Sequence, residues 1–166
     1  MANTDQPSYS GLTRGQIIPA FTLPATDGMP HSPWDYKQRE HLILLFPSST
    51  ATSEGRGLLR AFAQEYRAFR EEQCALLAIT ANPVIANLET QEALHLPFPL
   101  LSDVRGEVVA RYTHWDSSTR TSTPALFLAD RYSALHEQWV TEREADLPPI
   151  AELVSILQYL NRLCTP

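Results

Sequence analysis

The chain has 166 residues, of which 43% are hydrophobic and 19% are charged, and its net charge at pH 7 is −6. This length favours one domain with a substantial core. The acidic balance argues against nucleic-acid binding as the main activity, because neutralising phosphates needs a basic excess, and no stretch is apolar for long enough to span a bilayer.

The N-terminal residues 1–11 are polar and predict a flexible arm on a single domain that covers residues 12–166. The arm lacks the apolar core of a signal peptide, so we expect a cytoplasmic protein with no membrane association. Residues 17–26 follow as an extended segment, and its two prolines favour an edge strand or an extended lead-in over a central strand. We expect the rings of Trp34 and Tyr36, in the next loop, to cover the core.

An apolar run without alternation, residues 42–46, predicts a strand that is covered on both faces. Pro47 ends this strand, and a short polar loop leads to Ser53, a candidate helix N-cap. Apolar residues then recur at helical spacing and predict one helix over residues 54–72. Sites in α/β sheets tend to lie where the carboxyl end of a strand meets a helix N-terminus, so this loop is the first candidate for a functional site.

Two segments lie between this unit and the C-terminal third of the chain. Residues 75–80 predict a second buried strand, parallel to the first because a single helix connects them. Pro83 then predicts the first turn of a helix that carries the apolar residues Val84, Ile85 and Leu88.

The C-terminal third begins with a polar, irregular loop, residues 113–123, which we expect to approach Ser53 across the fold. Residues 125–129 and 134–140 predict an antiparallel hairpin, and a final helix begins at Ile150. The element order predicts an α/β, thioredoxin-like fold. Its central mixed sheet combines a parallel βαβ unit with a C-terminal β-hairpin, and helices flank it.

Three separated stretches resemble the peroxiredoxin-like redoxin family, of the alkyl hydroperoxide reductase and thiol-specific antioxidant (AhpC/TSA) type. They are GQIIPAFTLPATDG, LPFPLLSDVRGEVVARYTH and TPALFLADRYSALHEQW, and they occur in the family's order. The resemblance covers residues 12–163. It implies a thioredoxin-like fold and, for an active member, a thiol-dependent peroxidase or oxidoreductase with an antioxidant role.

The catalytic signature of that family is Pro-x-x-x-Thr-x-x-Cys, in which a helix N-terminus favours the reactive thiolate. The matching stretch here begins at Pro47 and is one residue shorter, so that either Ser53 or Glu54 falls at the cysteine position. A Cys-x-x-Cys alignment puts Ala51 and Glu54 at its two positions. None of these alignments has a cysteine at the required position, so we predict that the peroxidatic cysteine is missing. A serine hydroxyl cannot pass through sulfenic acid, so we do not expect peroxide reduction by the family's chemistry.

The family also places an arginine just before the first strand of the hairpin, where this chain has Pro124. Thr123-Pro124 resembles instead the cis-proline position of thioredoxin-type domains. Arg120 is near in sequence, but its spacing does not decide whether it reaches the site.

We expect the chain to be an inactive homologue that binds an unknown small molecule or protein in a hollow at Thr50, Ser53, Thr123 and Pro124, without catalytic residues or cofactors. The alternative is an antioxidant thiol-dependent oxidoreductase that uses Cys164 or Cys74. Of the two cysteines, Cys74 is next to a predicted buried strand and is interpreted as a core residue, because free cysteine is among the most buried residue types. Cys164 lies near the chain end. The sequence leaves the ligand, any residual redox activity and a homodimer open.

No histidine shows metal-ligand spacing, so no metal site is predicted. The local cluster His114-Trp115-Asp116 suggests a surface or dimer-contact loop. A hydrolytic triad of Ser53, His114 and Asp116 is a minor alternative, because no nucleophile-elbow pattern surrounds Ser53.

Overall fold

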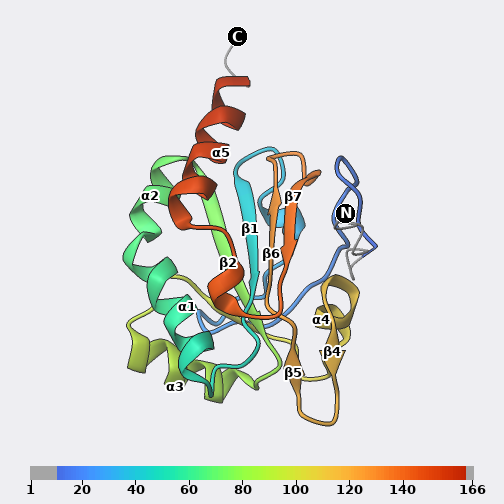
Figure 1. Cartoon of the computed structure of the whole chain (residues 1–166), viewed down its shortest axis with the longest axis vertical. Coiled ribbons are helices and arrows are strands. Elements are labelled where there is room, and N and C mark those ends of the chain that lie inside the picture. The colour runs from blue at the N-terminus through green and yellow to red at the C-terminus, as the bar shows by residue number, and fades with distance from the viewer. Residues whose placement is uncertain (1–10, 164–166) are drawn as a thin grey trace, which may run out of the picture.

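The computed structural model describes residues 11–163, which surround a central five-stranded sheet (Figure 1). Cys164 and most of the predicted arm therefore lie outside the described residues. The strands of this sheet are β1 (His41–Phe46), β2 (Cys74–Thr80), β3 (Leu100–Ser102), β6 (Ala125–Ala129) and β7 (Leu135–Val140). Their order in space is β3-β2-β1-β6-β7.

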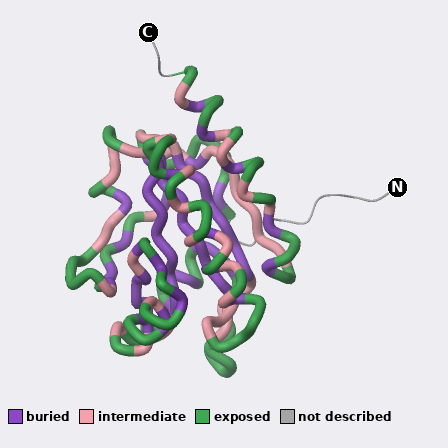
Figure 2. Tube along the Cα trace, turned by 90° about the vertical axis from the view of Figure 1, so that its left-hand side faces the viewer, coloured by how far each residue is buried: buried purple, intermediate pink, exposed green. Residues whose placement is uncertain are grey.

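The pairing of these strands confirms the predicted mixed sheet. β1 and β2 are parallel, with Leu42 opposite Ala75, and β2 continues in parallel to β3. β6 is antiparallel to both β1 and β7. β1 is therefore the central strand, and all six of its residues are buried (Figure 2). The arrangement is the α/β thioredoxin-like fold that the element order predicts.

Helices cover the sheet unequally. α1 (Ser53–Gln64), α2 (Tyr66–Glu71) and α5 (Ile150–Leu163) pack on one face through Phe62, Phe69 and Leu157. α4 (Glu107–Tyr112) and the chain before β1 cover the other face. There the ring of Tyr112 packs against those of Phe46 and Phe127, with centroid distances of 5.3 and 5.1 Å. β1 is buried from both sides because each face has its own apolar cluster.

The predicted helix over residues 54–72 is two helices, because the chain bends at Glu65. Side chains seven residues apart lie about 10 Å apart along a straight α-helix. The bend instead brings the rings of Phe62 and Phe69 to 5.4 Å, stacked within 5° of parallel. Stacking in the core thus accompanies the interruption of the helix, and hydrophobic periodicity alone does not reveal it.

Helix α3 (Val84–Leu94) differs from ordinary amphipathic helices, because it buries polar residues and exposes apolar ones. Asn87 is buried and donates to Ser102 Oγ at 2.9 Å and to the carbonyl of Leu101. Ile85 is 71% exposed. The Asn87 amide therefore ties the helix to the end of β3 by hydrogen bonds rather than by apolar packing.

Two other expectations concern the chain before β1. Trp34, in the 3-10 helix η1 (Pro33–Asp35), is 61% exposed and stacks under Lys37 instead of covering the core, whereas Tyr36 does pack against it. Residues 17–26 make only isolated bridges, to Ala134 among others, so of the two expected forms they are the extended lead-in and not the edge strand.

The polar loop 113–123 is more regular than expected. It forms a short hairpin of β4 (Trp115–Asp116) and β5 (Thr121–Ser122), which lies beside α4 (Figure 1). A second 3-10 helix, η2 (Glu144–Asp146), precedes α5. Both segments reach the loop that follows β1.

Candidate functional site

The loop after β1 is fixed from two sides. The carbonyl of Pro47 accepts a hydrogen bond from Ser122 Oγ at 3.1 Å, and that of Ser48 accepts one from the Ser122 amide at 3.2 Å. On the other side, Glu144 Oε1 accepts hydrogen bonds from the Ser48 amide, at 3.0 Å, and from the Ser48 hydroxyl. The β4–β5 hairpin and η2, which are far from β1 in sequence, thus hold the loop in one conformation.

A small hollow lies between this loop, the end of β2 and the β4–β5 hairpin. Its lining consists of Pro47, Ser48, Ser49, Thr50, Ile79, Thr80, Ala81, Asn82, Val109, Trp115, Arg120 and Ser122. Asn82 Nδ2 donates to Thr50 Oγ1 at 2.6 Å. The hollow has about 20 Å³ of room for the centres of water-sized molecules, which suffices for one or two waters.

Arg120 closes one side of the hollow. Its Nη2 donates to the carbonyls of Ala81 and Val104, both at 2.7 Å, and its guanidinium lies 5.8 Å from the ring centroid of Trp115. Trp115 in turn lies on Gly106, where a Cβ atom would come within 2.2 Å of the indole. Arg120 therefore reaches the site, but it binds backbone carbonyls instead of presenting a free cation to a ligand.

The predicted site residue Thr50 lines the hollow, whereas Ser53 does not. Ser53 is the exposed first residue of α1, and the helix is capped by Thr52, whose hydroxyl accepts from the Gly55 amide at 3.1 Å. The prediction of Ser53 as N-cap is therefore wrong, because Thr52 has the extended backbone that a cap requires. Glu54, in the first turn, forms an ion pair with Arg143 at 3.1 Å.

Thr123 and Pro124 lie beside the hollow, at the entry to β6. The Thr123 amide donates to the carbonyl of His114 at 2.9 Å, and the carbonyl of Pro124 accepts from the Thr141 amide at 3.0 Å. Residues 11–163 contain no cis peptide bond, so the Thr123–Pro124 bond, which the sequence left open, is trans, and the resemblance to the cis-proline position does not extend to the bond itself. The chain runs from β5 almost directly into β6, and the trans form, which X–Pro bonds prefer, suits this extended path.

Three lining residues that the sequence did not single out for this site are Asn82, Trp115 and Ser122. The sequence did contain a signal for Asn82, because this residue lies two positions after the predicted strand 75–80. That strand is parallel to β1, and the carboxyl ends of parallel strands share one edge of the sheet. No pattern placed Ser122 against Pro47.

The sulfur of Cys74 lies far from this hollow. Cys74 is opposite His41 at the start of β1 and is fully buried, and burial raises the pKa of its thiol. The loop follows Phe46, five residues further along β1, which is roughly 17 Å at the rise of a strand. The interpretation of Cys74 as a core residue is confirmed.

The contacts of Asp116 disfavour the hydrolytic triad. Its Oδ1 accepts hydrogen bonds from the hydroxyl of Ser118 at 2.6 Å and from the amide of Ser118 at 2.9 Å. These hydrogen bonds, together with one from the Thr119 amide, lower the pKa of Asp116. The carboxylate thus stabilises its own turn.

The part of the chain that the structure describes offers neither a metal site nor a membrane-spanning helix. Residues 11–163 contain no group of three or more His, Cys, Asp or Glu residues that could hold a metal ion. Over the same range, no helix combines the length and apolar character needed to cross a membrane.

Comparison with known proteins places this geometry in a family. The chain is 26% identical over 161 residues to a peroxiredoxin of Aquifex aeolicus, covering 89% of this chain and 71% of that protein. The fold resembles peroxidoxin BcpB of Mycobacterium tuberculosis, with a TM-score of 0.77, 19% identity and coverage of 93% and 99%. It also resembles the reduced 2-Cys peroxiredoxin of Plasmodium vivax, with a TM-score of 0.79, 18% identity and coverage of 91% and 83%. Residues 14–138 match the model of the AhpC/TSA family, and the chain therefore belongs to that family.

Proposed function

We propose that this chain is a peroxiredoxin-like protein that has lost the peroxidatic cysteine and the active-site arginine and that acts by binding a ligand or partner. The observation that carries the proposal is the start of α1, where Ser53 and Glu54 occupy the place that a reactive thiolate would need. A hydroxyl or carboxylate cannot be oxidised to sulfenic acid by peroxide, so the family's reaction has no starting group there.

The placement of Cys74 supports the same proposal. Peroxide must reach a thiolate, and reactive thiols lie in partly exposed, electropositive surroundings. Cys74 is fully buried, its pKa is raised by burial, and its sulfur contacts the carbonyl of Ala75 at 3.4 Å. We assign Cys74 a structural role in the core.

The small hollow is the proposed binding position. Of the predicted ligand-binding set, we retain Thr50 as a direct contact, with Asn82 and Trp115 beside it, and place Ser53, Thr123 and Pro124 outside the contact. Room for one or two waters suits the hydroxyl, amide or carboxylate end of a larger ligand or of a partner's side chain. The rest of such a ligand would lie along the loop surface.

A peroxide-consumption assay tests the loss of activity. The purified chain is mixed with hydrogen peroxide and dithiothreitol, and we expect no turnover above the buffer rate. The matched variants are Cys74→Ser and Cys164→Ser, which remove each thiol in turn. Titration of native thiols before and after peroxide treatment is the second measurement, and we expect no peroxide-dependent loss of the Cys74 thiol.

The alternative function, a thiol-dependent oxidoreductase, makes the opposite prediction. Turnover that disappears in the Cys164→Ser or the Cys74→Ser variant would overturn the proposal and identify the working thiol. Size-exclusion chromatography of the same samples tests the predicted homodimer independently, because oligomerisation does not require the redox chemistry.

A further inference from the structure

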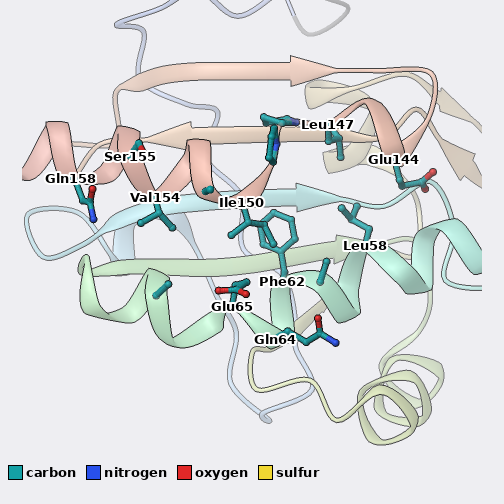
Figure 3. A pocket seen from close by; sticks show the side chains of 15 residues that line it. Leu58, Phe62, Gln64, Glu65, Glu144, Leu147, Ile150, Val154, Ser155 and Gln158 are labelled. Carbon is teal, nitrogen blue, oxygen red and sulfur yellow. The ribbon is translucent and has the colours of Figure 1, made fainter.

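A second concave surface is a groove on the helical face of the sheet, away from the small hollow. It lies between α1 and α2 on one side and α5 on the other, and its volume is about 690 Å³ (Figure 3). These helices share one face of the sheet, yet α5 does not pack closely against α1 or α2. The groove is the space left between them.

The lining of the groove is mainly apolar. Phe62 and Leu147 form the floor, and Leu58, Ile150 and Val154 point inward from the two sides (Figure 3). Ala61, Ala68 and Ala151 line the walls, where larger side chains would fill the space. A volume between 300 and 1,000 Å³ with a mainly apolar lining is characteristic of sites for small molecules.

The charges in the groove have one sign. Glu65 and Glu144 are the charged side chains that line it, and no lysine, arginine or histidine is among the lining residues. Glu144 is engaged at Oε1 by Ser48. For the carboxylate of Glu65, at the bend between α1 and α2, the described residues provide no ion pair or side-chain hydrogen bond.

We propose that this groove binds a small amphiphilic amine, with the apolar body on Phe62 and Leu147 and the ammonium group beside Glu65. An apolar ligand that covered Glu65 without a counter-charge would desolvate a carboxylate at a free-energy cost. An anionic amphiphile would add repulsion. An ammonium head supplies both the opposite charge and hydrogen-bond donors.

Binding can be measured by NMR with three probes of equal chain length below their aggregation concentrations: decylammonium, decanol and decanoate. We expect decylammonium to shift the amide signals of groove residues saturably and to bind more tightly than decanoate. Glu65→Gln should weaken decylammonium binding about two- to fivefold, as expected for a partly exposed ion pair, and leave decanol binding unchanged. Glu152→Gln is the matched control. It also removes one negative charge, but Glu152 is in α5 and does not line the groove.

Two further variants keep the proposal falsifiable. Ala151→Trp should fill the groove and abolish saturable binding of decylammonium and decanol. Glu65→Lys, at an exposed position, should reverse the preference toward decanoate. The proposal is overturned if no probe binds saturably, if decanoate binds the unmodified chain as tightly as decylammonium, or if Glu152→Gln weakens binding as much as Glu65→Gln.

Discussion

The two ends of β1 are both polar, but they are built from different groups. At the N-terminal end, His41, Cys74 and Asn161 bring a ring nitrogen, a thiol and an amide together under the end of α5. At the C-terminal end, Thr50 and Asn82 contribute a hydroxyl and an amide, and the carboxylate of Glu144 and the hydroxyl of Ser122 hold the loop. The buried thiol of Cys74 is thus at the end away from the loop.

From this difference we expect that a cysteine within the family's fold is insufficient for its chemistry. A thiolate needs positive potential and access for peroxide, which the start of a helix at the sheet edge supplies. The Cys74 end is enclosed by apolar side chains such as Phe69, and burial favours the neutral thiol. We therefore expect the end of the sheet at which a cysteine lies to decide whether it is structural or reactive.

The largest effect that we predict is protection of Cys74 from thiol–disulfide exchange. In a Cys164→Ser background, the native thiol should react with an aromatic disulfide reagent roughly a hundredfold or more slowly than in the urea-unfolded chain. The reason is that the reaction requires local opening, and an opening free energy of about 3 kcal/mol gives that factor. The rate of absorbance change measures it. If the native thiol reacted as fast as the thiol of the unfolded chain, Cys74 would not be enclosed, and the contrast between the two ends of β1 would be wrong.

The second prediction compares an asparagine at each end. Asn161 Oδ1 contacts His41 Nε2 at 2.8 Å and accepts from Arg131 at 2.9 Å, and its Nδ2 donates to Glu72. Asn161→Ala leaves several of these groups without a partner, so it should lower the free energy of unfolding by about 1–3 kcal/mol.

Asn82→Ala is the matched change at the hollow and removes the partly buried bond to Thr50, so we expect a loss of about 0.5–1.5 kcal/mol. Urea titration of both variants measures the free energies. A larger loss for Asn82→Ala than for Asn161→Ala would mean that the hollow, not the network under α5, is the more important polar contact for stability.

The third prediction concerns the pH dependence of stability. Burial, with a smaller contribution from Arg131, lowers the pKa of His41 below 6.5, while Asn161, Asp130 and Glu72 act in the opposite direction. As pH falls through about 6.5, the unfolded chain therefore binds a proton that the folded chain does not. Stability should then decrease toward acid, by at most about 1.4 kcal/mol per pH unit for one group.

Urea titrations between pH 7.5 and 5.5 measure this decrease. His136 acts in the same direction, because burial and Arg14 lower its pKa, so the comparison is made in a His136→Gln background. His41→Gln should flatten the pH dependence there. An unchanged slope in His41→Gln would show that the N-terminal end of β1 does not control it.

The sheet could be predicted from the sequence because its signals are local and strong. The apolar runs at residues 42–46 and 75–80 favour buried strands, and the helical connection between them favours their parallel pairing. The bend at Glu65 and the inverted helix α3 could not be predicted in this way. The bend accompanies ring stacking between Phe62 and Phe69. The orientation of α3 depends on the hydrogen bond from Asn87 to Ser102, which is 15 residues away in sequence.

The candidate site was predicted only in outline. The loop after β1 was identified from the strand–loop–helix pattern, and Thr50 does line the hollow. The cap was misplaced by one residue, because Thr52 and Ser53 are both good caps and only the backbone conformation decides between them. Ser122 and Glu144 hold the loop from 75 and 96 residues away in sequence. Such contacts leave no local pattern.

The smallest effect concerns a thiol introduced at the C-terminal end of β1. Ser53→Cys, in a background without Cys74 and Cys164, places sulfur in the first turn of α1, where the helix N-terminus favours thiolate by about 0.3–1 kcal/mol. Glu54 opposes this effect, but its ion pair with Arg143 offsets part of its charge. We therefore expect the pKa of the new thiol to lie below the free value of about 8.5, by less than one unit. The pH dependence of the alkylation rate measures it, and adding Arg143→Gln should raise the pKa again, because Glu54 then acts alone. A pKa at or above about 8.5 with Arg143 intact would show that this end of the strand does not favour thiolate, and the position we assign to the lost cysteine would lose its electrostatic support.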